Sequence, residues 1–304
     1  MAAQAELGFV GLGGMGGGLV KNLRKHGRAV RVLDRKPDAV AKAVSQGAMA
    51  ASGIKEIAER CDTILFCVNT AEDVESLVLG PRGLISFRQR GGLTVVDHTT
   101  TNPDTVQKLA LAIENQGGRF AEAPMTRTPK HADAGQVNVF YGGEAALLEE
   151  LRPIFQCYAE NIFHIGPRTH ATKLKLIHNY IAFANVAAWC EGFALAAKEG
   201  LDLSRAIEII SAAGAKSGML DLYGRMTLER DFTPHMSLAN ARKDVQYYAR
   251  WLEKAGLPGF MAEAVHQTYR QAGILGHDGE GCTAVIKAYE DVTGVEATLA
   301  ARKP

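Results

Sequence analysis

Short apolar segments alternate with helical patterns along the first half of the chain. The apolar segments lie at 6–10, 29–33, 63–68, 93–97, 119–122 and 137–141. Each has the length and composition of a strand, and helical stretches separate them. Strands that alternate with helices in this way predict a doubly wound, mainly parallel sheet. Ligands of such sheets bind beyond the carboxyl ends of the strands.

A long helical pattern ends this alternation. Residues 172–199 contain one glycine and no proline. Beyond Gly200 only helical patterns follow, at 203–213, 219–229, 238–255, 259–272 and 283–293. We therefore predict three parts, namely an α/β domain over residues 1–166, an interdomain helix over 167–200 and an all-α domain over 201–304.

The first strand runs directly into a glycine-rich turn. The turn Gly11-Leu12-Gly13-Gly14-Met15-Gly16 has the form GxGxxG, and a helical pattern and the second strand follow it. Gly11 permits the tight turn, Gly13 lets the backbone approach a pyrophosphate, and Gly16 allows close packing of the helix on the strand. The free amides and the positive dipole end of that helix favour phosphate groups. This unit predicts a Rossmann domain that binds a dinucleotide.

The end of the second strand bears on the choice of cofactor. Asp34 lies eighteen residues after Gly16, where an acidic side chain binds the ribose 2′-hydroxyl and would repel a 2′-phosphate. Arg35 and Lys36 follow at once and could hold that phosphate if Asp34 turned away, although a solvated loop is the simpler interpretation. The prediction is NAD, with NADP possible.

Polar residues follow the third and fourth strands. We assign Val68, Asn69 and Thr100 to the cofactor and Thr99 to the substrate, because the carboxyl ends of parallel strands form the ligand site. Asn69, Thr99 and Thr100 would serve equally well as helix caps or turn residues. The sequence shows no clustered spacing of His, Asp and Glu, so we predict no metal site.

Composition narrows the choice of partner and location. The chain has 304 residues, with 34 basic and 33 acidic side chains and a net charge of +1, so no bulk field favours nucleic acid or a membrane surface. Its five cysteines are odd in number and include no CxxC pair, which predicts free thiols in a reducing, cytoplasmic location. The opening segment is rich in glycine and lacks a basic leader, so we do not expect a signal peptide or membrane span there.

Four segments resemble the β-hydroxyacid dehydrogenase family. They lie at 8–16, 97–103, 122–143 and 166–179 and follow the order and spacing of the family over nearly the whole chain. The resemblance implies a Rossmann domain, a long interdomain helix and an all-helical domain that supports a homodimer or homotetramer. It also implies an NAD(P)-dependent oxidoreductase that interconverts a small anionic 3-hydroxy acid and its semialdehyde.

The resemblance places the catalytic lysine of the family at Lys175. Lys175 stands nine residues after Gly166 and four before Asn179, which selects it over Lys173. An amine can take the hydroxyl proton as hydride leaves in oxidation and return it to the alkoxide in reduction. Without the family context, Lys175 would be interpreted as a solvated lysine or a carboxylate anchor.

Further residues on the helical half also match the family. Asn179 corresponds to a residue that bonds the substrate, and Lys243 to one that reaches the nicotinamide end of the cofactor. Spacings of three and four place Lys175, His178 and Asn179 on one helix face. We expect His178 to bond a backbone carbonyl and Asp244 to pair or cap rather than react.

The substrate loop departs from the family pattern. Thr126, Arg127 and Thr128 stand where common members have a serine and two glycines that grip the substrate carboxylate. An arginine fork suits a carboxylate but also a sulfonate or phosphate. Similarity to the sulfolactaldehyde reductases of this family therefore gives an alternative substrate class, unless Arg127 pairs with Glu122 or folds outward. A non-catalytic dinucleotide-binding scaffold is the second alternative.

Overall fold

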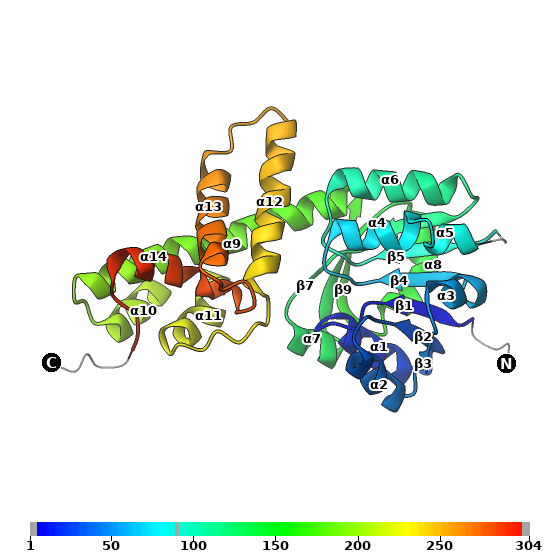
Figure 1. Ribbon diagram of the computed structural model, residues 1–304, viewed down its shortest axis with the longest axis horizontal. Coiled ribbons are helices and arrows are strands. Elements are labelled where there is room, and N and C mark those ends of the chain that lie inside the picture. The colour runs from blue at the N-terminus through cyan, green and yellow to red at the C-terminus, as the bar shows by residue number, and fades with distance from the viewer. Residues whose placement is uncertain (1–4, 89–90, 300–304) are drawn as a thin grey trace. The chain divides into compact units, whose positions relative to one another are not determined.

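The structure is a computed structural model that describes residues 5–88 and 91–299 (Figure 1). The chain forms two compact units, residues 1–175 and 176–304. The first unit is a sheet with helices on both faces, and the second is built from helices. The predicted fold class, a Rossmann domain followed by a long helix and a helical region, is confirmed.

The sheet contains nine strands within the described residues, in the order β3-β2-β1-β4-β5-β6-β8-β7, with β9 paired to β8. The strands are β1 (Leu7–Val10), β2 (Val30–Leu33), β3 (Met49–Ala50), β4 (Thr63–Phe66), β5 (Thr94–Asp97), β6 (Arg119–Glu122), β7 (Met125–Thr126), β8 (Val137–Gly142) and β9 (Ala159–Gly166). β1 is buried along its whole length and pairs in parallel with both β2 and β4. The chain order reverses between β1 and β4, which is where doubly wound sheets bind ligands.

The far half of the sheet departs from the predicted parallel arrangement. β8 runs antiparallel to β6 and β7 and parallel to β9. Between β7 and β8 the chain has only the short helix α7 (Pro129–Ala134), and this connection is too short for the crossover that a parallel pair needs. The sequence patterns also missed β3 and β7, which have two residues each, and β9, whose side chains are only partly buried.

Helices cover both faces of the sheet. One face is covered by α1 (Gly16–Lys25), α2 (Pro37–Ser45), α7 and α8 (Ala145–Phe155), and the other by α3 (Ile54–Arg60), α4 (Ala71–Leu79), α5 (Leu84–Phe87) and α6 (Pro103–Glu114). Figure 1 shows α4, α5 and α6 above the sheet and α1 and α2 below it. Each face has its own hydrophobic core, with Phe9 and Leu19 in one and Ile64 and Phe66 in the other.

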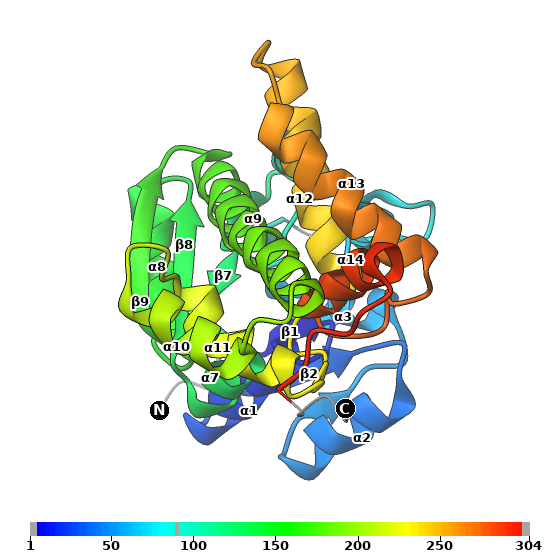
Figure 2. The same ribbon diagram turned by 90° about the vertical axis from the view of Figure 1, so that its left-hand side faces the viewer.

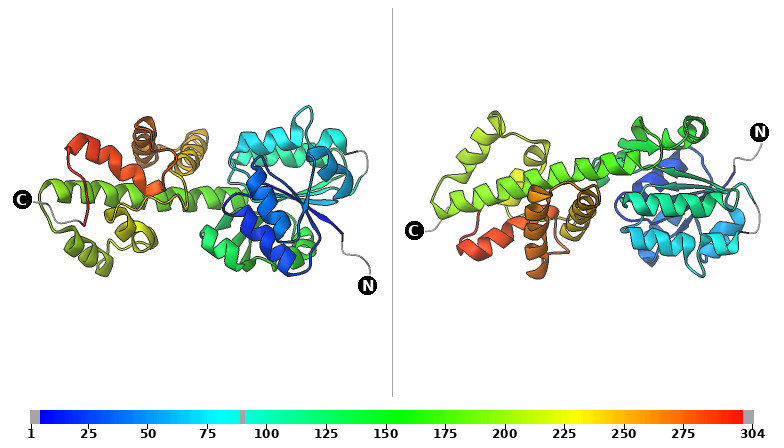
Figure 3. Two further views of the ribbon diagram at one scale, coloured as in Figure 1. Left: turned by 60° about the horizontal axis from the view of Figure 1, so that its bottom comes forward. Right: turned by 90° about the horizontal axis from the view of Figure 1, so that it is seen from above.

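Helix α9 (His170–Lys198) begins in the first unit and continues through the second. The second unit also contains α10 (Leu203–Ala212), α11 (Gly218–Leu228), α12 (Leu238–Lys254), α13 (Phe260–Ile274) and α14 (Ile286–Thr293). In Figure 2 and Figure 3, α10 and α11 lie on one side of α9, and α12, α13 and α14 on the other. By length and composition α9 could cross a membrane. Phe183, Val186 and Phe193, however, are buried in the core of the helical unit, which accounts for the apolar character of the helix.

Side-chain caps explain where several helices of the second unit begin. Asp202, Ser217 and Ser237 accept hydrogen bonds from first-turn amides of α10, α11 and α12. The helices predicted at 203–213, 219–229 and 238–255 start within two residues of these caps. The segment predicted as one helix at 283–293 instead begins as a 3-10 turn at Cys282–Val285.

Candidate functional site

The glycine turn after β1 has the geometry of a phosphate-binding loop. Gly11 has a φ of 98°, and a Cβ atom there would overlap the carbonyl oxygen of Cys67. A Cβ atom on Gly16 would overlap the carbonyl oxygen of Gly11. The space around Gly13 is open, so a ligand can approach its backbone. These three positions agree with the separate tasks that the GxGxxG pattern predicts.

The start of α1 suits an anionic group. The side chain of its N-cap, Met15, makes no capping hydrogen bond, and its first turn contains no acidic residue. The amides of this turn and the positive end of the helix dipole therefore lie beside the open space at Gly13 without a carboxylate to oppose a phosphate. Gly14 lies in the same turn, with a neighbouring contact from Pro129 of α7.

Asp34 lies beside the glycine turn at the end of β2. Its Oδ2 atom accepts a hydrogen bond from the Leu12 amide at 2.6 Å, and its Oδ1 atom accepts one from the Lys36 amide at 2.8 Å. The carboxylate is thus held beside the glycine turn, and its role toward the ribose stays a prediction. Arg35 is 83% exposed, and its Nη1 atom lies 3.9 Å from Oδ1 of Asp73.

The loops after β4 and β5 are joined by a hydrogen bond. The Thr99 hydroxyl accepts from the Val68 amide at 3.1 Å, and the Thr99 amide donates to Oδ1 of Asp97 at 2.9 Å. These bonds bring two predicted site residues together.

Helix capping by other residues removes one alternative interpretation of these loops. Thr70 caps α4 and Asn102 caps α6. Asn69, Thr99 and Thr100 are therefore not the caps of these helices, and their predicted ligand roles stay predictions.

His98, for which sequence reasoning gave no role, connects three segments of this region. Its Nδ1 atom lies 2.6 Å from the Ala123 carbonyl oxygen, and its Nε2 atom lies 3.0 Å from the Tyr158 hydroxyl. Burial lowers the pKa of His98 from 6.5 to about 4, so the ring is neutral at pH 7. His98 therefore holds the loop after β5 against the segments after β6 and before β9.

The predicted substrate loop is held by side chains of an adjoining strand and helix. Thr126 is buried, and its hydroxyl accepts a hydrogen bond from Nδ2 of Asn138 at 3.2 Å. The Thr128 hydroxyl lies 2.8 Å from Nδ1 of His131. Both threonines thus occupy fixed positions in the first unit.

Arg127 has an unusual backbone conformation and an acidic partner. Its φ is 80°, a region that favours glycine. Its Nη1 atom donates to the Gln136 carbonyl at 2.7 Å and pairs with Glu160. The carboxylate partner is Glu160, whereas the sequence suggested Glu122. Any anion bound by this guanidinium would share it with Glu160.

Burial separates the two lysines at the start of α9. Lys175 is 8% exposed, whereas Lys173 is only partly buried. Lysines are rarely this buried unless they have a role in binding or in an ionic interaction. The difference agrees with the choice of Lys175 from its spacing.

A buried polar cluster lies in the helical unit around Asn179. Its Nδ2 atom donates to Oδ2 of Asp244 at 2.6 Å, and Nζ of Lys243 lies 3.2 Å from Oδ1 of Asp244. Asp244 therefore pairs, as predicted. Nδ1 of His178 lies 2.9 Å from Oδ1 of Asn179, and the bond expected from His178 to a backbone carbonyl stays a prediction.

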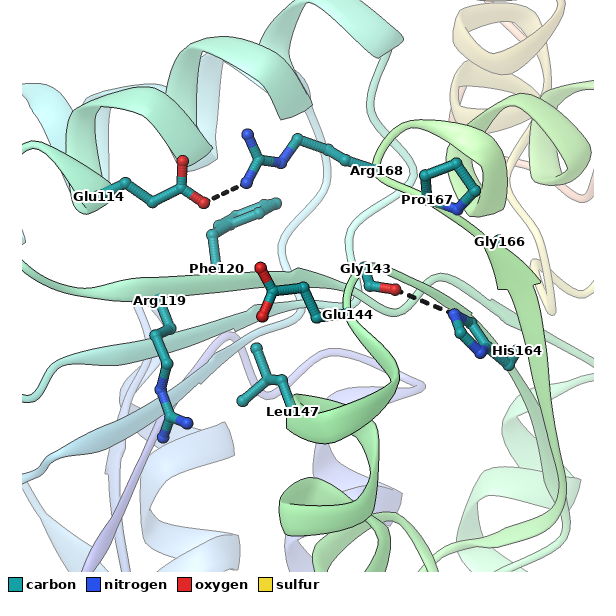
Figure 4. A pocket seen from close by; sticks show the side chains of 10 residues that line it. All are labelled: Glu114, Arg119, Phe120, Gly143, Glu144, Leu147, His164, Gly166, Pro167 and Arg168. Atoms are coloured by element: carbon teal, nitrogen blue, oxygen red, sulfur yellow. Dashed lines mark hydrogen bonds and ion pairs between the residues drawn. The ribbon is translucent and has the colours of Figure 1, made fainter.

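A separate pocket of about 360 Å³ lies in the first unit, away from the predicted residues (Figure 4). It is lined by Glu114, Arg119, Phe120, Gly143, Glu144, Leu147, His164, Gly166, Pro167 and Arg168. Arg168 pairs with Glu114 and Arg119 pairs with Glu150, so both guanidinium groups already have carboxylate partners. None of the predicted site residues lines this pocket. Within residues 5–88 and 91–299, no group of three or more His, Cys, Asp or Glu side chains could hold a metal ion.

The sheet order, the glycine turn and the open space at Gly13 define a dinucleotide-binding protein of the Rossmann class. Residues 6–166 match the family model described as the NAD binding domain of 6-phosphogluconate dehydrogenase. Residues 169–289 match the model described as the NAD-binding domain of NADP-dependent 3-hydroxyisobutyrate dehydrogenase. The chain belongs to the β-hydroxyacid dehydrogenase family.

The chain is similar to proteins that differ from one another in length and in name. The chain is 27% identical over 299 residues to 2-(hydroxymethyl)glutarate dehydrogenase of Eubacterium barkeri, covering 98% of this chain and 99% of that protein. It is 31% identical over 284 residues to the cytokine-like nuclear factor N-PAC of Gallus gallus, covering 93% of this chain but only 51% of that protein. The chain thus spans about half the length of the N-PAC relatives. The crystal structure of 3-hydroxyisobutyrate dehydrogenase from Salmonella typhimurium matches with a TM-score of 0.85 and 26% identity, covering 93% of this chain and 99% of that one.

The neutral state of His98 predicts a specific pH dependence of stability. Below pH 6.5 a histidine in the unfolded chain binds a proton, whereas His98 in the folded chain stays neutral until about pH 4. The stability contributed by neutral His98 is therefore complete above pH 6.5 and is lost as the pH falls toward 4, by up to about 3 kcal/mol. The free energy of unfolding, measured by urea denaturation between pH 7 and 4, should fall less steeply with decreasing pH in His98→Gln than in the wild type. The same pH dependence in both proteins would contradict the assignment of His98 as a neutral ring.

Proposed function

We propose that the chain is an NAD(P)-dependent oxidoreductase that interconverts a small anionic 3-hydroxy acid and the matching semialdehyde. The observation that supports this most directly is the buried amine of Lys175 in a chain of this family with a complete phosphate-binding turn. Burial disfavours the charged form of an amine and so makes its deprotonation easier. An amine that loses and regains a proton near neutral pH suits general acid–base catalysis.

The cofactor would be held mainly by the first unit. The turn from Gly11 to Gly16 would hold the pyrophosphate, and Asp34 would bind the adenosine ribose. When bound, the nicotinamide accepts or donates the hydride. We assign NAD as the preferred cofactor, because a 2′-phosphate would face the carboxylate of Asp34. NADP remains an alternative if Arg35 binds that phosphate. Lys243 is assigned to the nicotinamide end.

Lys175 would move the proton that balances the hydride. In oxidation, its neutral amine accepts the proton of the substrate hydroxyl while the hydride leaves the same carbon. In reduction, its ammonium returns a proton to the oxygen of the former aldehyde. Asn179, four positions later on α9, would orient the oxygen of the substrate through its amide.

The anionic end of the substrate is assigned to the loop from Thr126 to Thr128, together with Thr99. Three threonine hydroxyls and one guanidinium can donate to the oxygens of a sulfonate, but they also suit a carboxylate. Sulfolactaldehyde is therefore the alternative substrate. The pairing of Arg127 with Glu160 does not separate the two substrate classes, because a carboxylate and a sulfonate each carry one negative charge.

Relatives named as nuclear factors support a second candidate, a non-catalytic dinucleotide-binding scaffold. The candidates are separated by a substrate panel of tartronate, methylmalonate and succinic semialdehydes and sulfolactaldehyde, run with NADH and NADPH. Turnover of one aldehyde supports the enzyme and names its substrate class. Cofactor binding without oxidation of either nucleotide across the panel would support the scaffold. We also propose a cytoplasmic location, which agrees with five free cysteines.

Self-association is the second part of the proposal. On α9, Ile181, Asn185, Ala188, Gly192 and Leu195 are exposed and recur at alternating steps of four and three. This spacing forms one seam along a helix, and its small central residues would let a second helix approach closely. We propose that a second copy of the chain covers this seam in a homodimer or homotetramer.

Removal of the Lys175 amine tests the proposed chemistry. We expect Lys175→Ala to lower kcat by about 10²–10⁴-fold, because general acid–base catalysis contributes on that scale. Binding of NADH, followed by its fluorescence, should be unchanged. Lys173→Ala is the matched control, and its kcat should equal that of the wild type. Wild-type turnover by Lys175→Ala would remove the assignment.

Two variants test Arg127 from opposite directions. Arg127→Gly should raise KM for the anionic aldehyde by the worth of a charged hydrogen bond, about 1.5–3 kcal/mol or roughly 10- to 150-fold. It should not unfold the chain, because glycine favours the observed φ. Glu160→Gln should lower KM, since it releases the guanidinium from its partner. If neither variant changes KM, Arg127 does not bind substrate.

A charge placed in the seam of α9 tests self-association. Ala188→Arg should reduce the mass measured by light scattering to that of one chain, because two arginines would meet across a seam built of small residues. Glu208→Arg, on the exposed surface of α10, is the control for charge alone and should retain the wild-type mass. A wild-type chain that is already monomeric at micromolar concentration would contradict the proposal.

A further inference from the structure

A buried carboxylate lies where β6 ends, and the proposed reaction does not use it. Glu122 is 1% exposed and is opposed in the sheet by Asp97 of β5 and Gly142 of β8. An ionised carboxylate at such a position needs donors on both oxygens to offset its lost hydration. The groups that donate to Glu122 therefore show which segment of the chain its carboxylate holds.

The donors come from the start of α9, far along the chain. The Ala171 amide donates to Oε1 at 3.2 Å and the Thr172 amide donates to Oε2 at 3.1 Å, across 49 and 50 residues. The Thr169 amide and the Thr172 hydroxyl also stabilise the carboxylate. Burial raises the pKa of Glu122, and these hydrogen bonds oppose that rise. Glu122 therefore caps the first turn of α9 from a distant strand.

Gly142 of β8 leaves space in the sheet for the carboxylate of Glu122. A Cβ atom on Gly142 would overlap Oε1 of Glu122, so any larger residue on β8 would displace the carboxylate. Thr169 supports the same arrangement with a φ of 73°, which turns the chain sharply just before α9. The strand, the turn and the first turn of the helix thus fit together around one carboxylate.

We propose that Glu122 is a positioning residue for Lys175, which it serves by fixing the first turn of α9 and by placing a negative charge at that end of the helix. This inference rests on the role proposed for Lys175. Lys175 follows Thr172 by three positions, which is less than one helical turn. Small rotations of that turn would move the amine directly.

The charge has a second effect on the amine. Lys175 is the sixth residue of α9, and a carboxylate at the start of the helix favours an ammonium on the next turn by Coulomb attraction. Replacement of Glu122 by a neutral group should therefore favour the neutral amine. The other titratable groups that face Glu122, Asp97 and Tyr141, stay the same in the variant.

The test uses an isosteric pair of variants. Glu122→Gln removes the charge of the buried cap, and Asp202→Asn removes the charge of a carboxylate that caps α10 through the amides of Ser204 and Arg205. For Glu122→Gln we expect faster amide exchange over residues 169–176, measured by mass spectrometry. We also expect kcat to fall roughly 10- to 100-fold with little change in KM, as for a misplaced catalytic group.

The pH profile of kcat/KM distinguishes a positioning role of Glu122 from a role in the stability of the fold alone. For oxidation of the hydroxy acid, the rising limb of kcat/KM should move to lower pH in Glu122→Gln by roughly 0.3–1 pH unit. Asp202→Asn should leave that limb in place. An unmoved limb in Glu122→Gln, with kcat equal to that of Asp202→Asn, would overturn the inference.

Gly142→Ala provides an independent variant, because it keeps the carboxylate but removes the room for it. It should also speed amide exchange over residues 169–176 and lower kcat. Exchange that equals the wild type in both Glu122→Gln and Gly142→Ala would overturn the capping role. Amide exchange is measured without substrate, so it tests the cap independently of the proposed function. Wild-type turnover by Lys175→Ala would remove the proposed function and leave the cap itself intact.

Discussion

The hydrogen bonds between the Glu122 carboxylate and the first turn of α9 are the interaction on which the rest of the structure most depends. They attach the helix that contains Lys175 to the end of a sheet strand. A buried carboxylate without donors, or a buried helix end without acceptors, would each cost about 1–3 kcal/mol or more. Each satisfies the other, so the position of α9 in the first unit follows from the position of β6.

The sequence was most informative where the physical constraint is local. The turn between β1 and α1 could be predicted because Gly11 and Gly16 have no room for a side chain, and the same short segment contains both of them. The choice of Lys175 over Lys173 came from the resemblance to the family in the spacing from Gly166 and Asn179, and its catalytic role stays a prediction. Lys175 is also the more buried of the two lysines.

The sequence was least informative where the partner is distant. Nothing near Glu122 indicates that its donors lie 49 and 50 residues away, and nothing near His98 indicates Tyr158, 60 residues away. The direction of β8 depends on the length of its connection rather than on its own pattern, so its apolar run predicted a strand but not an antiparallel one. Arg127 departs from the family pattern in the sequence itself, yet the sequence does not identify Glu160 as its partner.

Helix α9 combines an apolar part, whose burial the sequence pattern predicts, with a polar part whose partners are distant in the sequence. Beyond Tyr180 the helix is mainly apolar and fills the core of the helical unit, so its pattern alone predicts burial. Before Tyr180 it contains buried polar groups that need specific partners. Glu122 satisfies the amides of Ala171 and Thr172 in the first unit, and Asp244 accepts from Asn179 in the second. Lys175 lies between these two points in the sequence. Carboxylates thus hold the polar part of α9 at two points, and the proton transfer that we propose for Lys175 would benefit from that restriction.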